Sequence, residues 1–301
     1  QEYGAADIGY LTLSLHYLTD IRKDFLEEKD EWIEKIIIFL SYFFHLDGSI
    51  GNVYGSRGSS IIYPSGFFSS GYLDVNDFLL SAIKNKKIPL QSDLDDTNFA
   101  PFINSLVRSC LSLENQVSRN LILPLTKERY LKIFNEAGLV VLKNQEKQTI
   151  IDLNKSGVDA LFTKTGCKRS ALPAISTANR RNIFCAFNSS FKVTEEDGIT
   201  SISINSKFHK INTKPINSLS IVGSRLSIPF FVSFPWILKY LKKFIVSVYF
   251  LPGKSVGNYR KSIRIEDFIL TSDYSYDIPQ DFIFIEEYKH HPIRMASQNY
   301  I

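Results

Sequence analysis

The residues best suited to chemistry gather in one glycine-rich loop. His45 and Tyr54 carry groups that can give and take a proton. Arg57 and Asn52 can neutralise or hydrogen-bond a carboxylate, and Tyr63 offers a ring on which a sugar can stack. β-Elimination of a uronate-containing glycan needs these three tasks: the carboxylate is neutralised, the C5 proton is removed, and the leaving oxygen is protonated.

A lyase for such a glycan would use this loop in a defined way. We expect Tyr54 to transfer the proton, Arg57 to pair with the sugar carboxylate, and His45 to assist. The alternative is structural, because a loop can also simply connect two helices. In that case Tyr54 would be packed and Arg57 would pair with an acidic side chain, and the sequence leaves both interpretations open.

The start of the chain is a second candidate for sugar binding. Tyr3 and Tyr10 could flank a sugar ring, although an aromatic core would use the same residues. Asp7 lies between them, and its expected role is the N-cap of the helix that follows. These three residues join Asn52 and Tyr63 as candidate substrate-binding residues.

Two further groups of residues have metal-binding chemistry. The acidic run at residues 93–97 could hold a cation or share a proton, but it equally suits a solvated turn that caps the next helix. His209, His290 and His291 would form a structural divalent metal site in the second half only if scattered positions converge. We therefore expect neither a cofactor nor a catalytic metal.

Composition favours a globular protein that does not bind nucleic acid. The 301 residues are 44% hydrophobic, and the formal charge of +4 is not gathered into one basic arm or stripe. A small net positive charge is compatible with an acidic polysaccharide as the binding partner. Cys110, Cys167 and Cys185 lack metal-site spacing, so we expect free thiols or packing residues, with one disulfide left open.

Helical periodicity dominates the first part of the chain. Apolar residues recur at helical spacing in residues 8–25 and 30–44, and again in 75–84 and 99–113. Two such pairs separated by a long loop are typical of α/α hairpin arrays. Because two pairs bury too little surface to fold alone, we expect further helices before Gln1 or support from the second half.

The apolar period becomes strand-like after Pro124. Short apolar runs separated by turn residues predict antiparallel strands at residues 138–144, 148–154, 182–188, 199–205, 244–250, 261–270 and 281–287. The expected architecture is therefore α+β, with a helical domain at 1–125 and a β-sandwich domain at 126–301.

One apolar stretch, residues 228–251, departs from this pattern. Two prolines and three lysines interrupt it, which argues against a membrane-spanning helix. Its lysine and aromatic residues would suit a helix lying at a membrane surface. Packing between the two halves is the interpretation that we favour.

Several segments resemble heparinase II/III-like proteins, and together they span most of the chain. In the first half they are EYGAADIGYLTLSLHYL, DGSIGNVYGSRGSSIIYPSGF and DLDDTNFAPFINSLVRSCL. In the second half they are FNEAGLVVLKNQEKQTIIDLNKSGV, PFFVSFPWILKYLKKFIVSVYFLPGKSVGNYRKSIRIEDFILTSDYSYDI and MASQNYI. The resemblance implies a partial (α/α) toroid followed by an antiparallel β-sandwich, and a polysaccharide lyase for heparin, heparan sulfate, alginate or a related glycan. It also favours the bacterial periplasm or cell envelope over the cytoplasm.

Two other classes of protein remain open. A non-catalytic glycan-binding or surface-polysaccharide assembly protein would keep the same fold without the chemistry. A class II terpene cyclase is the second, because residues 93–97 resemble its D-x-D-D-T acid motif and residues 47–51 resemble its D-G-S-W-G repeats. That fold is helical throughout, whereas the second half of this chain has the pattern of strands.

Overall fold

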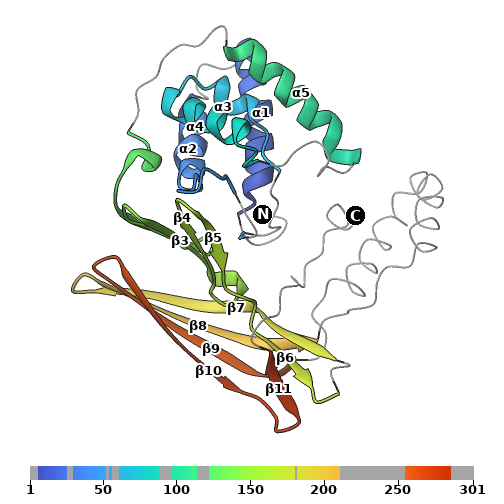
Figure 1. Ribbon diagram of the computed structural model, residues 1–301, viewed down its shortest axis with the longest axis vertical. Helices are drawn as coiled ribbons and strands as arrows, with labels where there is room; N and C mark the ends of the chain where they lie inside the picture. Colours follow the sequence, from blue (N-terminus) through green and yellow to red (C-terminus); the bar gives the residue numbers. More distant parts are fainter. Residues whose placement is uncertain are drawn as a thin grey trace, which may run out of the picture.

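The chain combines a helical layer with two antiparallel sheets, so the predicted α+β class is confirmed. Figure 1 shows the helices at one end, a small sheet next to them, and a larger sheet at the far end. The computed structural model describes residues 6–25, 30–51, 54–55, 61–88, 96–113, 122–179, 182–210 and 255–285.

The helices pack around the short helix α3, which contacts α1, α4 and α5. They are α1 (Ile8–Phe25), α2 (Asp30–Ser41), α3 (Ser65–Phe68), α4 (Leu73–Lys84) and α5 (Asp96–Leu113). The four predicted helices are confirmed, but α2 ends at Ser41, where the chain turns toward a bridge between Phe44 and Ile50. Helix α3 was not expected, because it lies within a stretch whose glycine and serine content suggested only loop.

The strands form two sheets, each consisting of antiparallel pairs. The five-stranded first sheet has the order β1 (Tyr130–Phe134), β2 (Leu139–Lys143), β3 (Lys147–Asp152), β4 (Val158–Thr163), β5 (Gly166–Arg169). The six-stranded second sheet has the order β10 (Ile269–Asp277), β9 (Ser255–Glu266), β8 (Ile199–Lys210), β7 (Ile183–Glu196), β6 (Ala174–Thr177), β11 (Phe282–Ile285). The described residues also include two short 3-10 helices, η2 (Pro124–Thr126) and η3 (Leu153–Lys155).

Five predicted strands coincide with β2, β3, β7, β8 and β11 and are confirmed. The predicted strand at 261–270 lies on strand residues, but it is not one strand. A turn at Asp267 and Phe268, both at positive φ, divides it between β9 and β10. Strands β1, β4, β5 and β6 and most of β10 were not predicted. In β5 and β10 most side chains are exposed, so the sequence has no apolar run there. The predicted strand at 244–250 lies outside the described residues.

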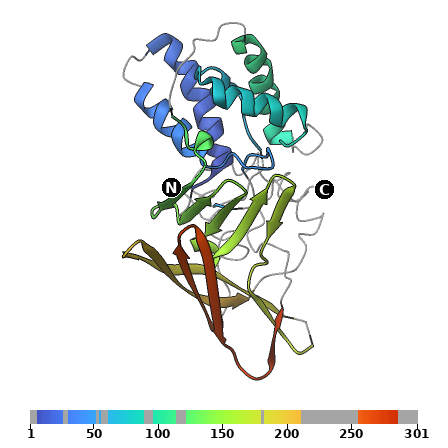
Figure 2. The ribbon, with the colours of Figure 1, turned by 60° about the vertical axis from the view of Figure 1, so that its left-hand side comes forward.

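Side chains that alternate between the two faces of β2 and β3 join the helices to the second sheet. Leu139, Val141 and Ile150 belong to the cluster that includes the helices, whereas Val140 and Ile151 pack against the second sheet. Successive strand residues point to opposite faces, so the first sheet is buried on both sides. Figure 2 shows this middle layer between the helices and the larger sheet.

The second sheet curls until its two edge strands approach each other. Tyr276 of β10 stacks on Phe284 of β11 with ring centroids 4.8 Å apart and an interplanar angle of 8°. Phe208 and Tyr259 lie in the same inner cluster, which is separate from the contact with the first sheet. The outer face of this sheet is therefore turned away from both other layers.

The remaining expectations concern the cysteines and a possible membrane segment. All three cysteines are free thiols, and Cys185 is buried. No helix within the described part of the chain is long and apolar enough to cross a membrane. Residues 228–251, proposed as a membrane-surface or inter-half segment, lie outside that part.

Candidate functional site

A tight turn after α2 positions the imidazole of His45. The backbone N–H of His45 donates to the carbonyl oxygen of Ser49 at 2.9 Å, and that of Gly48 donates to the carbonyl oxygen of His45 at 2.9 Å. Gly48 has φ +82°, a backbone conformation that glycine adopts without steric cost. Asp47 completes the turn, because its Oδ1 accepts from the backbone N–H and the hydroxyl of Ser49.

A buried chain of hydrogen bonds runs from Tyr54 through His45 to Gln148. The Tyr54 hydroxyl lies 2.8 Å from Nε2 of His45, and Nδ1 of His45 lies 3.0 Å from Oε1 of Gln148. The amide nitrogen of Gln148 donates to the carbonyl oxygen of Tyr42 at 2.8 Å, so its amide oxygen is the one that faces His45. That oxygen can only accept, so Nδ1 carries the proton and Nε2 accepts from the Tyr54 hydroxyl.

Burial keeps both members of the Tyr54–His45 pair uncharged. Desolvation lowers the pKa of His45 to about 4, against smaller opposing effects of the Gln148 hydrogen bond and the Asp47 charge. Desolvation also raises the pKa of Tyr54 well above its ordinary value. At neutral pH a neutral phenol therefore donates to a neutral imidazole.

Aromatic packing fixes the orientation of both rings. The His45 ring stacks on Phe162 of β4 with centroids 3.6 Å apart and an angle of 8°. The Tyr54 ring stacks on Phe43 at 5.4 Å. Only 5% of Tyr54 and 1% of His45 is exposed, so the pair is almost completely enclosed.

The first sheet also anchors the loop that carries Tyr54. The backbone N–H of Gly55 donates to Oδ2 of Asp152 at 2.9 Å. Asp152 is buried at the end of β3, and Nζ of Lys155 lies 3.6 Å from the same Oδ2. The loop and the sheet thus share one buried carboxylate.

Strand β5 places a cation beside the pair. Arg169 lies opposite Ala160 and Cys167 lies opposite Phe162 in the β4–β5 pairing. Since Ala160 and Phe162 face the helices, the side chains of Arg169 and Cys167 project to that face as well. Burial is the larger effect on both groups, and it raises the pKa of Tyr54 and lowers that of His45. The positive charge of Arg169 opposes burial at Tyr54 and adds to it at His45.

Of the other candidate residues in the glycine-rich loop, the structure describes Tyr63 but not Arg57 or Asn52. Tyr63 is buried, its ring packs against Phe102 at 6.4 Å, and its backbone N–H donates to the hydroxyl of Thr12. Its ring therefore lies in the helical core rather than on an open sugar-stacking surface. Arg57 and Asn52 lie outside the described residues, so the structure brings only His45 and Tyr54 together from this loop.

The start of the chain behaves as the capping interpretation predicts. Oδ1 of Asp7 accepts a hydrogen bond from the backbone N–H of Tyr10 at 3.0 Å, in the first turn of α1. Tyr10 is 51% exposed, whereas Tyr3 lies outside the described residues. The N-cap role of Asp7 is confirmed, and a role in substrate binding stays a prediction.

The metal-site hypotheses receive no support from the described residues. No group of three or more His, Cys, Asp or Glu side chains that could hold a metal ion occurs among them. His209 lies on β8, while His290 and His291 fall outside the described part. Asp96 and Thr97 begin α5, and the acidic residues at 93–95 are not described.

A second hydroxyl–histidine pair was not expected from the sequence. Nδ1 of His16 lies 2.5 Å from the Ser65 hydroxyl, which also receives a hydrogen bond from the Ser105 hydroxyl at 3.0 Å. Nε2 of His16 has no hydrogen-bond partner among the described residues, and desolvation lowers the pKa of the ring. All three side chains are buried between α1, α3 and α5, which fits a polar contact that joins these helices.

Gln148 and Arg169 are the site residues that sequence reasoning missed. Gln148 lies 103 residues from His45, and its only local signal is a glutamine at the start of an apolar strand pattern. Arg169 lies on a polar edge strand, which has no sequence signal of its own. Comparison of this chain with protein-family models, curated proteins and solved structures found no match.

Proposed function

We propose that this protein handles an acidic, uronate-containing glycan and that the Tyr54–His45 pair transfers protons in a β-elimination. One observation carries the proposal: the Tyr54 hydroxyl lies 2.8 Å from an imidazole nitrogen that is free of a proton at neutral pH. A phenol held against a neutral imidazole can give up its proton at the moment it accepts another.

In the proposed reaction the Tyr54–His45 pair accepts one proton from C5 of the uronate and donates one proton to the leaving oxygen. The Tyr54 oxygen takes the C5 proton of the uronate while its own hydroxyl proton passes to Nε2 of His45. The electron pair of the C5–H bond forms the C4–C5 double bond, and the bond from C4 to the glycosidic oxygen breaks. His45 then returns its proton through Tyr54 to the leaving oxygen, so the pair ends as it began.

Arg169 is the proposed partner of the sugar carboxylate among the described residues. Its positive charge opposes protonation of His45, in the same direction as the larger effect of burial. A bound uronate carboxylate would cancel that charge, which favours the transient imidazolium, and pairing with Arg169 would make the C5 proton more acidic. The earlier candidate for this role, Arg57, remains a second proposal from the glycine-rich loop.

We also propose the finer architecture implied by the sequence resemblance. The helices would be the last part of an (α/α) toroid, and the two sheets would form the β-sandwich of a heparinase II/III-like protein. The apolar cluster shared by β2, β3, β8 and β9 supports face-to-face packing of the two sheets. The strands between residues 130 and 285 argue against the terpene cyclase alternative, since that fold is helical.

A non-catalytic glycan-binding or assembly protein is the second candidate. The observation in its favour is the enclosure of His45 and Tyr54, whose polar atoms already satisfy one another. Such a pair would stabilise the joint between the loop and the sheet without chemistry.

Arg169 offers a direct test of the elimination. The full-length protein would be incubated with pectate, alginate, hyaluronan and heparin while the ultraviolet absorbance of the unsaturated uronate is recorded. Arg169→Gln should lower the initial rate at least about tenfold. Lys168→Gln, an equal charge change on the opposite face of β5, should leave it unchanged. No product from any glycan would favour the binding alternative, and equal losses in both variants would remove Arg169 from the site.

A further inference from the structure

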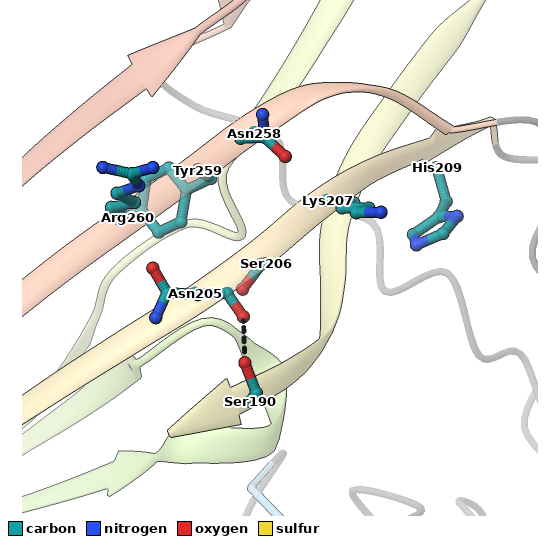
Figure 3. Close-up of a pocket in the computed structure, with 8 residues that line it drawn as sticks. All are labelled: Ser190, Asn205, Ser206, Lys207, His209, Asn258, Tyr259 and Arg260. Carbon is teal, nitrogen blue, oxygen red and sulfur yellow. Dashed lines mark hydrogen bonds between the residues drawn. The ribbon is translucent and has the colours of Figure 1, made fainter. Parts of the chain in front are cut away.

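The outer face of the second sheet carries a hollow of about 310 Å³ that is lined mainly by polar and charged residues. Figure 3 shows the eight residues that line it. By the strand register, six of them share the outer face of β7, β8 and β9: Ser190, Asn205, Lys207, His209, Asn258 and Arg260. In the sheet register Asn205 lies opposite Arg260, and Lys207 lies opposite Asn258. The hollow is therefore remote from Tyr54, with both sheets between them.

Two irregularities in strand pairing border this hollow. The β7–β8 register shifts between Phe187 and Ser190, and the β8–β9 register shifts between Lys207 and His209. β-Bulges increase local twist and redirect side chains, and they are over-represented next to functional sites. They give a physical reason why this part of the outer face is hollowed.

Positive charge is concentrated in the hollow. Lys207 and Arg260 are diagonal neighbours across β8 and β9, a spacing at which two long side chains can reach one ligand group. Neither has an ion-pair partner among the residues that the structure describes. Asp273 and Asp277 lie on the same face of β10, and neither forms an ion pair with these two cations. Two exposed cations without a bound carboxylate can accept an anionic group.

Neutral polar groups surround the two cations. Asn205 and Asn258 each offer amide donors and an acceptor, and the Ser190 hydroxyl donates to the carbonyl oxygen of Asn205 at 3.4 Å. Side-chain amides pair well with hydroxyl groups, which both donate and accept. Cations for an anionic group beside amides for hydroxyl groups match the chemistry of an acidic sugar.

We infer that this hollow binds the carboxylate or sulfate group of an acidic saccharide, with Lys207 and Arg260 on the anion and the two asparagines on neighbouring hydroxyl groups. The inference rests on the proposed function, because it takes its ligand from the same class of glycan. The hollow would be a second binding site for the polymer, at a distance from the Tyr54–His45 pair.

The test is binding of fluorescently end-labelled oligosaccharides of pectate, alginate, hyaluronan and heparin, measured by polarisation at low salt. The Lys207→Gln/Arg260→Gln double variant should bind the preferred oligosaccharide at least about tenfold more weakly than the unmodified protein. The matched control is Lys192→Gln/Arg264→Gln, which makes the same charge change on the same face outside the hollow. The control should bind as the unmodified protein does.

Two further probes define the ligand. The carboxyl-reduced, neutral form of a uronate oligosaccharide should bind much more weakly than its acidic form. Inorganic sulfate should compete only at far higher concentration than the oligosaccharide, because it lacks the hydroxyl groups that the asparagines recognise. Competition by sulfate at equal concentration would show that the hollow binds any free oxyanion, and would overturn the saccharide assignment.

The remaining outcomes separate this inference from the elimination. Equal weakening in both double variants, or no binding of any oligosaccharide, would reject the hollow as a site. Hollow-dependent binding without unsaturated product would keep the hollow and reject the elimination. If the Lys207/Arg260 double variant binds the oligosaccharide and forms product as the unmodified protein does, the elimination is kept and the hollow is rejected as a site.

Discussion

Oδ2 of Asp152 accepts a hydrogen bond from the backbone N–H of Gly55 at 2.9 Å, across 97 residues of sequence. The same carboxylate accepts hydrogen bonds from the backbone N–H groups of Asn154 and Lys155 through Oδ1. A buried acidic group of the β-structure therefore holds the loop in which Tyr54 lies. The position of the proposed proton-transfer pair depends on the sheet as much as on the helices.

Replacing Asp152 should release this loop. Asp152→Asn removes the buried carboxylate that lies 3.6 Å from the Lys155 ammonium and should lower the free energy of unfolding by about 3 kcal/mol. Urea denaturation would measure the change. The Asp152→Asn/Lys155→Met double variant should recover part of the loss, and purely additive effects of the two substitutions would contradict the coupling.

Gly55 should tolerate no side chain. It has φ +81°, and a Cβ there would lie well inside van der Waals contact with the carbonyl oxygen of Ala6. Gly198 has φ +78° with open space around it, so Gly198→Ala should cost only the backbone strain of about 1–2 kcal/mol. Gly55→Ala should lower the melting temperature clearly more than Gly198→Ala, and equal shifts would show that the Ala6 contact is unimportant.

The helical segment should not fold by itself. Its core cluster includes Leu139, Ile150 and Phe162 from the first sheet, so residues 1–125 alone would expose a large apolar surface. We expect this fragment to aggregate or to melt without cooperativity in calorimetry. A cooperative melt of the isolated fragment would contradict the expectation.

Periodicity in the sequence predicts the helices and the buried strands, but it does not predict how they meet. The apolar run of β2 identifies a strand buried on both faces only when the helices and β8 are known to cover it. His45 and Tyr54 are nine residues apart, so their proximity could be expected from one loop. Gln148 and Arg169 could not be expected, because tertiary pairing alone brings them beside that loop.

Stability should fall on mild acidification because His45 is buried as the neutral imidazole. Its pKa is lowered from 6.5 to about 4, chiefly by desolvation, so the unfolded chain binds a proton more readily than the folded protein between these values. The contribution of neutral His45 to the free energy of unfolding is fully present above about pH 6.5 and is lost as the pH falls toward 4. It amounts to roughly 3 kcal/mol.

A histidine variant tests the origin of this pH dependence. The free energy of unfolding of His45→Gln should vary less between pH 6.5 and pH 4 than that of the unmodified protein. An unchanged slope in His45→Gln would assign the effect to other groups.

The most direct measurement compares two tyrosine variants on a uronate glycan. Tyr54→Phe removes the hydroxyl that lies against His45, whereas Tyr130→Phe removes a partly buried hydroxyl 3.4 Å from the amide nitrogen of Gln148 in the same network. If Tyr54 transfers the proton, the rate of unsaturated product formation should fall about 10²–10⁴-fold in Tyr54→Phe, and Tyr130→Phe should stay within a few-fold of the unmodified protein. Equal rates for Tyr54→Phe and the unmodified protein would contradict the proposed role of the pair.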